Sequence, residues 1–313
     1  MRACVFIQTN HRQMLGALVS HYSLQRASKH NDAFDVRIMN HGDHAFFRSK
    51  EGKPYLRGGS EAIWRNDDLQ SFTPLRFMPP ELMGYAGRAV VIDPDVFAVA
   101  DVHELLSRDM EGKAVMCRRA APAPDKNKAA KTKAAEGGLP TSVMLLDCGK
   151  LRHWRCENDF NELFAFARDY ADWMSLKLED RETVGLFEDE WNDFDTLTER
   201  TKLLHTTKRR TQPWKTGLPF EFTVPEKSKK KNSKGSPIRK WFLQARRSVF
   251  GGGNKRLYEP HRDPNQERFF FGLLRECIDK GVVSEDLVRE EMKRNHIRHD
   301  ALKVLEQTPP LAA

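Results

Sequence analysis

Two carboxylates stand where a run of apolar residues stops. Residues 89–92 are apolar, and Asp93, Pro94 and Asp95 follow them directly. Four consecutive β-prone residues bounded by a turn predict a buried strand. Because carboxylates are almost never buried without a partner, two of them at i and i+2 require a bound cation or a hydrogen-bonding cap at the strand end.

A divalent cation is one partner that fits this pair. Two carboxylates at a strand end bring hard oxygen ligands together, which suits Mg²⁺ or Mn²⁺, and such an ion keeps open positions for the phosphate oxygens of a substrate. A structural turn is the alternative for Asp93 and Asp95. A second pair, Asp193 and Asp195, follows polar and acidic residues instead of an apolar strand, so we expect a loop or cap there.

The composition is that of a soluble globular protein from a reducing compartment. The chain has 313 residues, of which 39% are hydrophobic and 31% charged, enough for one large α/β domain or two modest ones. No apolar stretch approaches the roughly 18 residues of a membrane span. The five cysteines never occur in CxxC spacing, which argues against a disulfide framework or a thiolate zinc site. With no secretory signal visible, we expect a cytoplasmic protein.

The positive charge is concentrated in one segment. Residues 227–256 contain eleven Lys or Arg and no Asp or Glu, so the net charge of +8 leaves the remainder of the chain at −3. A nucleic-acid-binding domain more often spreads its basic residues over the fold. The segment is therefore predicted to be a basic appendage on a mildly acidic body.

Strands alternate with helices along the first 220 residues. This alternation predicts an α/β layer with a largely parallel sheet, and ligands of such sheets bind at the carboxyl ends of the strands, where Asp93 and Asp95 fall. Residues 42–65 are expected to be loop-rich with a Gly-Gly turn, and residues 121–138 to form a low-complexity loop. The expected strands cover residues 3–8, 34–40, 89–92, 113–117 and 141–148, and residues 201–207 are expected to form a short strand or a turn. The expected helices cover 11–28, 158–177, 266–281 and 284–295, the last with Ser284 as its cap.

Three separate motifs occur in an informative order. Arg76 precedes a Pro-Pro-Glu-Leu segment, the strand and its acidic turn follow, and His205 lies 110 residues beyond Asp95 in "HTTKRRTQPWK". This arrangement resembles the retaining, metal-dependent glycosyltransferases of family 8, the glycogenin-like group with the GT-A fold. The resemblance covers roughly residues 1–223.

The resemblance implies a fold and a set of metal ligands. The fold is an α/β, Rossmann-like GT-A domain, here with a helical C-terminal extension. Asp93, Asp95 and His205 would hold a divalent ion, Mn²⁺ or Mg²⁺, with His205 as a neutral imidazole. Asp95 would also contact the donor ribose, and Arg76 the donor's phosphates or sugar. A hydrogen-bonded core histidine is the alternative for His205.

Two further strands contribute to the implied donor site. Gln8, Thr9 and Asn10 match the place where the family's first strand meets the nucleotide base and ribose. Ser142 matches a family glycine beside the donor sugar, and Asp147 matches a family asparagine on the same strand. The implied donor is a nucleotide sugar, with UDP as the expected nucleotide.

The chain departs from the family pattern after His205. The family lysine before Pro-Trp is replaced by Gln212, one residue later than usual, and the middle glycine is missing. A positive charge beside the leaving diphosphate would then come from another basic residue, although a solvated turn explains this cluster equally well. The candidates are Lys208, Arg209, Arg210 and Lys215. The family's Asp-Gln pair near the acceptor is not recognisable, and Asp169 and Asp172 lie in comparable territory.

The implied reaction is transfer of a sugar from a nucleotide-diphosphate donor to a glycan, glycolipid or other acceptor with retention of configuration. A bound metal ion would neutralise charge on the leaving diphosphate. No carboxylate of the sequence stands out as a nucleophile, and retaining enzymes of this type are thought to let the acceptor attack on the same face. No catalytic base is therefore assigned.

After the catalytic domain at 1–223, the chain divides into a basic linker, 224–257, and a helical region, 258–313. Within the linker, residues 237–250 place apolar side chains on one face of a helix and basic ones beside it. Such a helix suits the surface of an anionic membrane, and packing on the body is the alternative. The membrane interpretation predicts a peripheral protein on the inner face of the membrane.

Two other functions stay open. The segment 227–256 would dominate in a nucleic-acid-binding protein, but few aromatic side chains interleave with its basic residues, so nucleic acid is not an expected partner. A scaffold that keeps the fold without activity would have no need of three metal ligands. The sequence leaves open whether the C-terminal helices pair two chains into a homo-oligomer.

Overall fold

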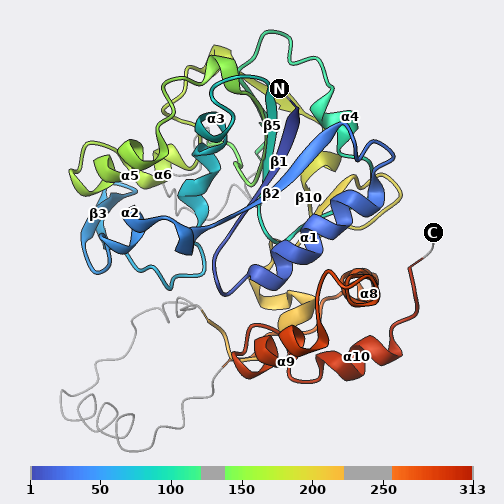
Figure 1. Cartoon of the computed structure of the whole chain (residues 1–313). Helices are drawn as coiled ribbons and strands as arrows, with labels where there is room; N and C mark the ends of the chain where they lie inside the picture. The colour runs from blue at the N-terminus through green and yellow to red at the C-terminus, as the bar shows by residue number, and fades with distance from the viewer. Residues whose placement is uncertain (1, 121–137, 222–255, 312–313) are drawn as a thin grey trace, which may run out of the picture.

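A six-stranded sheet forms the centre of the protein, whose computed structural model describes residues 2–120, 138–221 and 256–311. Two predicted segments lie outside the described residues: the low-complexity loop expected at 121–138, except for residue 138, and the amphipathic helix expected at 237–250. The sheet order is β2-β1-β5-β8-β7-β9, and β8 alone runs antiparallel to its neighbours. The predicted α/β class with a largely parallel sheet and a helical C-terminal region is confirmed (Figure 1).

The main strands alternate between two apolar layers. Along β1, Cys4 and Phe6 face one cluster of buried side chains, and Val5 and Ile7 face the other. This period of two on a sheet covered on both faces explains the continuous apolar runs of the sequence. The strands of this sheet are β1 Ala3–Thr9, β2 Phe34–Asn40, β5 Arg88–Ile92, β7 Val115–Arg118, β8 Val143–Asp147 and β9 Val184–Phe187.

Different elements cover the two faces of the sheet. Helices α5 and α6 and the β3–β4 hairpin pack on one face, while α1, α4 and a small three-stranded sheet of order β10-β11-β6 cover the other (Figure 1). The remaining strands are β3 Pro54–Arg57, β4 Ser60–Ile63, β6 Val96–Ala98, β10 Asp193–Phe194 and β11 Leu203–His205. The helices of the body are α1 Met14–Ala27, α2 Ala45–Arg48, α3 Pro79–Leu82, α4 His103–Leu106, α5 Cys156–Phe164 and α6 Tyr170–Trp173.

Three C-terminal helices follow, and the first of them packs against α1. They are α8 Pro264–Asp279, α9 Glu285–Lys293, which Ser284 caps as predicted, and α10 Ala301–Gln307. Apolar side chains of α1 and α8 share one buried cluster, and Glu276 of α8 accepts hydrogen bonds from Tyr22 and Arg26 of α1, both at 2.7 Å. None of the helices in the described residues combines the length and apolar character that crossing a bilayer requires.

The predicted secondary structure is wrong in two regions. The single helix expected over 158–177 is interrupted between α5 and α6, where Phe166 adopts a left-handed backbone with φ of 59°. The loop expected over 42–65 contains the β3–β4 hairpin around its Gly-Gly turn. Asp169 connects both features, because its carboxylate accepts the N–H groups of Gly58, Gly59 and Ala171 at 2.7–2.8 Å.

Two short segments far apart in sequence meet beside the C-terminal helices. Pro219 and Leu257 form an antiparallel bridge, and the Phe220 N–H donates to the Arg256 carbonyl at 2.9 Å. Tyr258 N–H donates to the Leu218 carbonyl at 2.8 Å. These bonds pair residues 217–220 with residues 256–258 on either side of segment 222–255.

Gly16 lets α1 approach the acidic turn. A Cβ at this position would lie 2.8 Å from the carbonyl oxygen of Pro94, which is closer than real Cβ contacts allow. Helix α1 therefore supports the turn that carries Asp93 and Asp95 through direct backbone contact.

Gly16→Ala is expected to destabilise the protein by about 1–3 kcal/mol, because the added methyl meets backbone that cannot move without displacing the turn. The same change in an exposed helix would stabilise by about 1 kcal/mol. Gly272→Ala in α8 is the matched control, since its Cβ would meet the side chain of Leu311, near the end of the described residues, instead of backbone. Urea unfolding measures both variants, and equal free energies of unfolding for wild type and Gly16→Ala would contradict the close approach.

Asp101 joins the end of α1 to the start of α4. Its carboxylate accepts from the Ser28 hydroxyl at 2.6 Å, from the backbone of His103 at 2.9 Å and from the ring of His30 at 2.7 Å. Burial acts to raise the pKa of Asp101, but these hydrogen bonds outweigh it and lower the pKa to about 2.

Asp101→Asn is expected to cost about 1–2 kcal/mol of unfolding free energy at neutral pH. A depressed pKa contributes stability that is present above the unfolded value near 3.8 and is lost as the pH falls through about 2. The difference between wild type and variant should therefore stay constant from pH 7 to 4 and shrink below it. Urea unfolding at several pH values tests this, with exposed Asp32→Asn as the control that should change little at any pH.

Candidate metal centre

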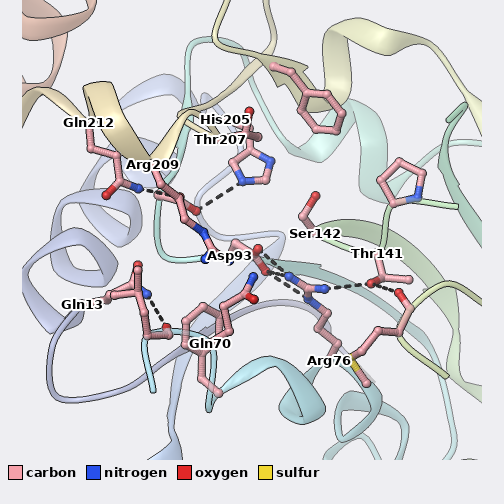
Figure 2. A pocket seen from close by; sticks show the side chains of 16 residues that line it. Gln13, Gln70, Arg76, Asp93, Thr141, Ser142, His205, Thr207, Arg209 and Gln212 are labelled. Atoms are coloured by element: carbon pink, nitrogen blue, oxygen red, sulfur yellow. Dashed lines mark hydrogen bonds and ion pairs between the residues drawn. The ribbon is translucent and has the colours of Figure 1, made fainter. Parts of the chain in front are cut away.

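A pocket opens at the carboxyl end of β5, beside the ends of β1 and β11. It has a volume of about 400 Å³. Figure 2 shows its polar side chains converging from several elements. The lining residues are Gln13, Leu69, Gln70, Phe72, Arg76, Asp93, Asp95, Pro140, Thr141, Ser142, Met174, Phe194, His205, Thr207, Arg209 and Gln212.

Asp93, Asp95 and His205 meet in this pocket. Each offers one ligand atom, and these atoms all lie within 4.8 Å of one another. The two carboxylates come from the turn between β5 and β6, and His205 ends β11, which pairs antiparallel with β6 so that His205 lies opposite Val96. Strand pairing thus brings together residues 110 positions apart.

Asp93 is buried against the guanidinium of Arg76. Arg76 Nη2 lies 2.6 Å from Asp93 Oδ2 and 2.8 Å from Oδ1, and the Gln8 amide also donates to Oδ1. Burial raises the pKa of Asp93, and the positive charge of Arg76 opposes that rise. Arg76 Nη1 donates in addition to the Thr141 hydroxyl at 2.9 Å, which fixes the guanidinium over the carboxylate.

Asp95 has two partners of its own. Its Oδ1 lies 3.3 Å from His205 Nε2, and its Oδ2 accepts from Gln212 Nε2 at 3.1 Å (Figure 2). Burial acts to lower the pKa of His205, but the adjacent Asp95 carboxylate outweighs burial and raises it. Gln212, the residue that departs from the family pattern, thus binds one of the two carboxylates.

This donor set fits a divalent cation. Two carboxylates and one imidazole are suitable ligands for Mn²⁺ or Mg²⁺, and opposite ligands of Mg²⁺ stand about 4.2 Å apart, so the present spacing of up to 4.8 Å needs only small side-chain movements. Gln8 Oε1, beside Asp93, is buried and finds no hydrogen-bond partner among the described residues. An incoming ligand or its water would supply one.

The other donor-site residues predicted at the end of β1, Thr9 and Asn10, do not line the pocket. Asn10 is fully buried and donates to Ser71 Oγ and to the Asp68 carbonyl, both at 3.1 Å, which fastens the loop before Arg76. Thr9 Oγ1 donates to the Asn10 carbonyl at 3.2 Å. Neither side chain lines the pocket.

The basic residues after His205 occupy different places. Arg209 lines the pocket, whereas Lys208 is exposed and its backbone N–H donates to Asp195 Oδ1 at 2.9 Å. Lys215 is buried outside the pocket lining, with Nζ 2.6 Å from Glu221 Oε1. Burial lowers the pKa of Lys215, and Glu221 opposes the shift.

Two acidic residues singled out from the sequence lie away from the ligands. Asp147 pairs with Arg88 at the amino end of β5, the edge of the sheet opposite Asp93. Asp172 of α6 lies outside the pocket lining, and its Oδ1 is 3.5 Å from Lys177 Nζ.

Sequence reasoning missed several residues of the site, among them three with polar side chains, Thr141, Gln13 and Asn192. Thr141 binds Arg76, Gln13 lines the pocket beside α1, and Asn192 lies behind His205 with its Oδ1 2.9 Å from the ring Nδ1. Ser142 Oγ accepts from Asn192 Nδ2 at 3.1 Å. A weak signal for Asn192 existed in its position beside the second Asp-x-Asp pair, but neither spacing nor composition indicated its partner.

Comparison with known proteins gives only distant likenesses. No protein-family model matches the chain, and no curated protein matches it. Among solved structures, the galactosyltransferase LgtC, solved with donor and acceptor sugar analogues, aligns at 15% identity and a TM-score of 0.46 over 67% of this chain and 89% of LgtC. The glycosyltransferase GlyE of Streptococcus pneumoniae TIGR4 aligns at 14% identity and a TM-score of 0.46, over 90% of this chain and 64% of GlyE. Mouse xyloside xylosyltransferase 1 aligns at 12% identity and a TM-score of 0.42, over 66% of this chain and 98% of the xylosyltransferase.

Arg76→Gln is expected to destabilise the protein by roughly 3–5 kcal/mol, because it leaves the Asp93 charge buried without its partner. Asp93→Asn in the same chain should recover much of the loss, since the pair is then removed together. Arg65→Gln is the control: its pair with Glu51 is exposed and should contribute less than about 1 kcal/mol. Urea unfolding of wild type, Arg76→Gln, Asp93→Asn and the double variant measures the coupling, and additive losses in the double variant would contradict the ion-pair account.

Proposed function

We propose that this chain is a metal-dependent glycosyltransferase of the GT-A type, which moves a sugar from a nucleotide-diphosphate donor to an acceptor. The observation that carries the proposal is the meeting of Asp93, Asp95 and His205 at the carboxyl end of the parallel strands. They come from two of the three motifs whose order and spacing give the sequence its resemblance to family 8, and a ligand trio at this edge of the sheet suits a bound diphosphate.

The donor would lie in the pocket with its diphosphate toward the trio. Asp93, Asp95 and His205 would hold the divalent ion, which we expect to be Mn²⁺ or Mg²⁺ and which supplies charge neutralisation at the leaving diphosphate. Arg209 lines the same pocket and adds positive charge on that side. The hydroxyl of Ser142 and the amide of Gln70 line the pocket as well and offer hydrogen bonds to a sugar.

Retention of configuration is the outcome that the resemblance to family 8 implies, and the carboxylates of the pocket bear on the route by which it would occur. Among the described residues that line it, Asp93 and Asp95 are the acidic ones, and both belong to the ligand trio. No lining carboxylate is then left to attack the donor sugar. We therefore favour attack by the acceptor on the face that the diphosphate leaves, with UDP as the expected leaving nucleotide.

The acceptor and the location in the cell rest on the sequence. A glycan or glycolipid acceptor, attachment to an anionic membrane through 237–250 and a cytoplasmic location are proposals, because the basic segment lies outside the described residues. The domain limits at 223 and 257 are proposals as well. The alternative of a nucleic-acid-binding or scaffold protein depends on 227–256, and no observation among the described residues favours it.

Mn²⁺-dependent binding of one nucleotide is the expected result when UDP and GDP are titrated calorimetrically into the protein. Asp95→Ala should abolish the metal-dependent part, because it removes one ligand of the trio. Asp35→Ala, which removes a carboxylate of an exposed ion pair with Arg2, is the control and should bind as wild type does. Absence of nucleotide binding under every condition would overturn the proposed function, and binding that ignores Mn²⁺ would overturn its metal requirement.

A further inference from the structure

The segment around the second Asp-x-Asp pair supports His205 from behind. Strand β10 runs parallel to β11 with Phe194 opposite His205, and the two rings meet edge to face with centroids 5.5 Å apart. Asp195 accepts the Lys208 N–H at 2.9 Å and also binds the Thr207 hydroxyl, which fastens the chain directly after the histidine. The pair predicted to be a loop or cap therefore forms a short strand and a cap beside a metal ligand.

Asn192 is the residue of this segment that forms a hydrogen bond with the imidazole. It is fully buried, its Oδ1 lies 2.9 Å from His205 Nδ1, and its Nδ2 donates to Ser142 Oγ at 3.1 Å. The Asn192 carbonyl accepts from Arg118 Nη1 at 2.6 Å, which holds the backbone in place. Because Nδ2 binds the Ser142 hydroxyl, the amide oxygen is directed toward the ring.

This contact determines which ring nitrogen carries the proton. An amide oxygen only accepts hydrogen bonds, so His205 Nδ1 must be the donor. In the neutral imidazole, Nε2 then keeps its lone pair, and Nε2 is the atom that faces Asp95 at 3.3 Å. A hydrogen-bond acceptor behind a metal-binding histidine fixes the ring orientation and commonly raises metal affinity by 10–100-fold.

We propose that Asn192 is a positioning residue, which orients His205 and holds it in the Nδ1–H form so that Nε2 is directed at the metal centre. The inference rests on the proposed function for the identity of that centre. The hydrogen bond itself can be tested without metal, so the two can fail separately.

The test compares Asn192→Leu, which removes the acceptor, with Asn192→Asp, which keeps the shape and offers a stronger one. Asn66→Leu is the matched control, because Asn66 Oδ1 accepts a ring N–H from Trp64 at the same distance of 2.9 Å, away from the metal centre. Thermal unfolding reports how much stability each variant loses. Two measurements on the full chain then follow: Mn²⁺ affinity from the electron paramagnetic resonance signal of free Mn²⁺, and the slowly exchanging His205 ring N–H resonance in metal-free protein labelled with ¹⁵N-histidine.

Asn192→Leu is expected to weaken Mn²⁺ binding by about 10–100-fold and to lose the ring resonance. Asn192→Asp should retain Mn²⁺ binding and move the resonance downfield, and Asn66→Leu should change neither. An unmoved resonance in Asn192→Asp would overturn the proposal even if the leucine variant fails to fold. Equal Mn²⁺ affinity in wild type and a folded Asn192→Leu would overturn it too. If wild type binds no Mn²⁺ while the resonance responds as expected, the metal centre is wrong and the positioning of His205 stands.

Discussion

The burial of Asp93 is the constraint on which the rest of the site depends. A carboxylate with 7% exposure needs a cation and donors around it, and Arg76 supplies the charge. Arg76 in turn donates to the hydroxyl of Thr141. The next residue, Ser142, accepts a hydrogen bond from Asn192, and the amide oxygen of Asn192 contacts the ring of His205. The chain of contacts closes when His205 reaches Asp95, two residues from the start. Each member thus satisfies a polar group that its neighbour would otherwise bury unpaired.

Much of this arrangement could be predicted because local patterns indicated it. The apolar run before Asp93 predicted a buried strand, and the break at the acidic turn predicted a ligand edge, since parallel strands end on one side of a sheet. His205 was found through the order of three motifs. Helix α8 and the Ser284 cap followed from apolar periodicity and from the preference of serine for helix starts.

The rest depends on contacts that no local pattern encodes. Asn192 has an ordinary polar neighbourhood in the sequence, and only the pairing of β10 with β11 brings it to the histidine. Gly16 looks like a weak point in α1 until the fold brings Pro94 against it. The break at Phe166 was missed because apolar residues continue through it at helical spacing, while Asp169 captures the backbone of a hairpin more than a hundred positions away.

The pairing of residues 217–220 with 256–258 has a consequence for the 34 residues between 222 and 255. The described residues on either side of this segment are held together by hydrogen bonds, so the two ends of the segment are fixed at one place on the body. The entropy of closing such a loop grows only slowly, by about 0.6 kcal/mol for each doubling of length. Lengthening or shortening residues 222–255 is therefore expected to cost little and to leave the paired ends, and the candidate metal centre beyond them, in place.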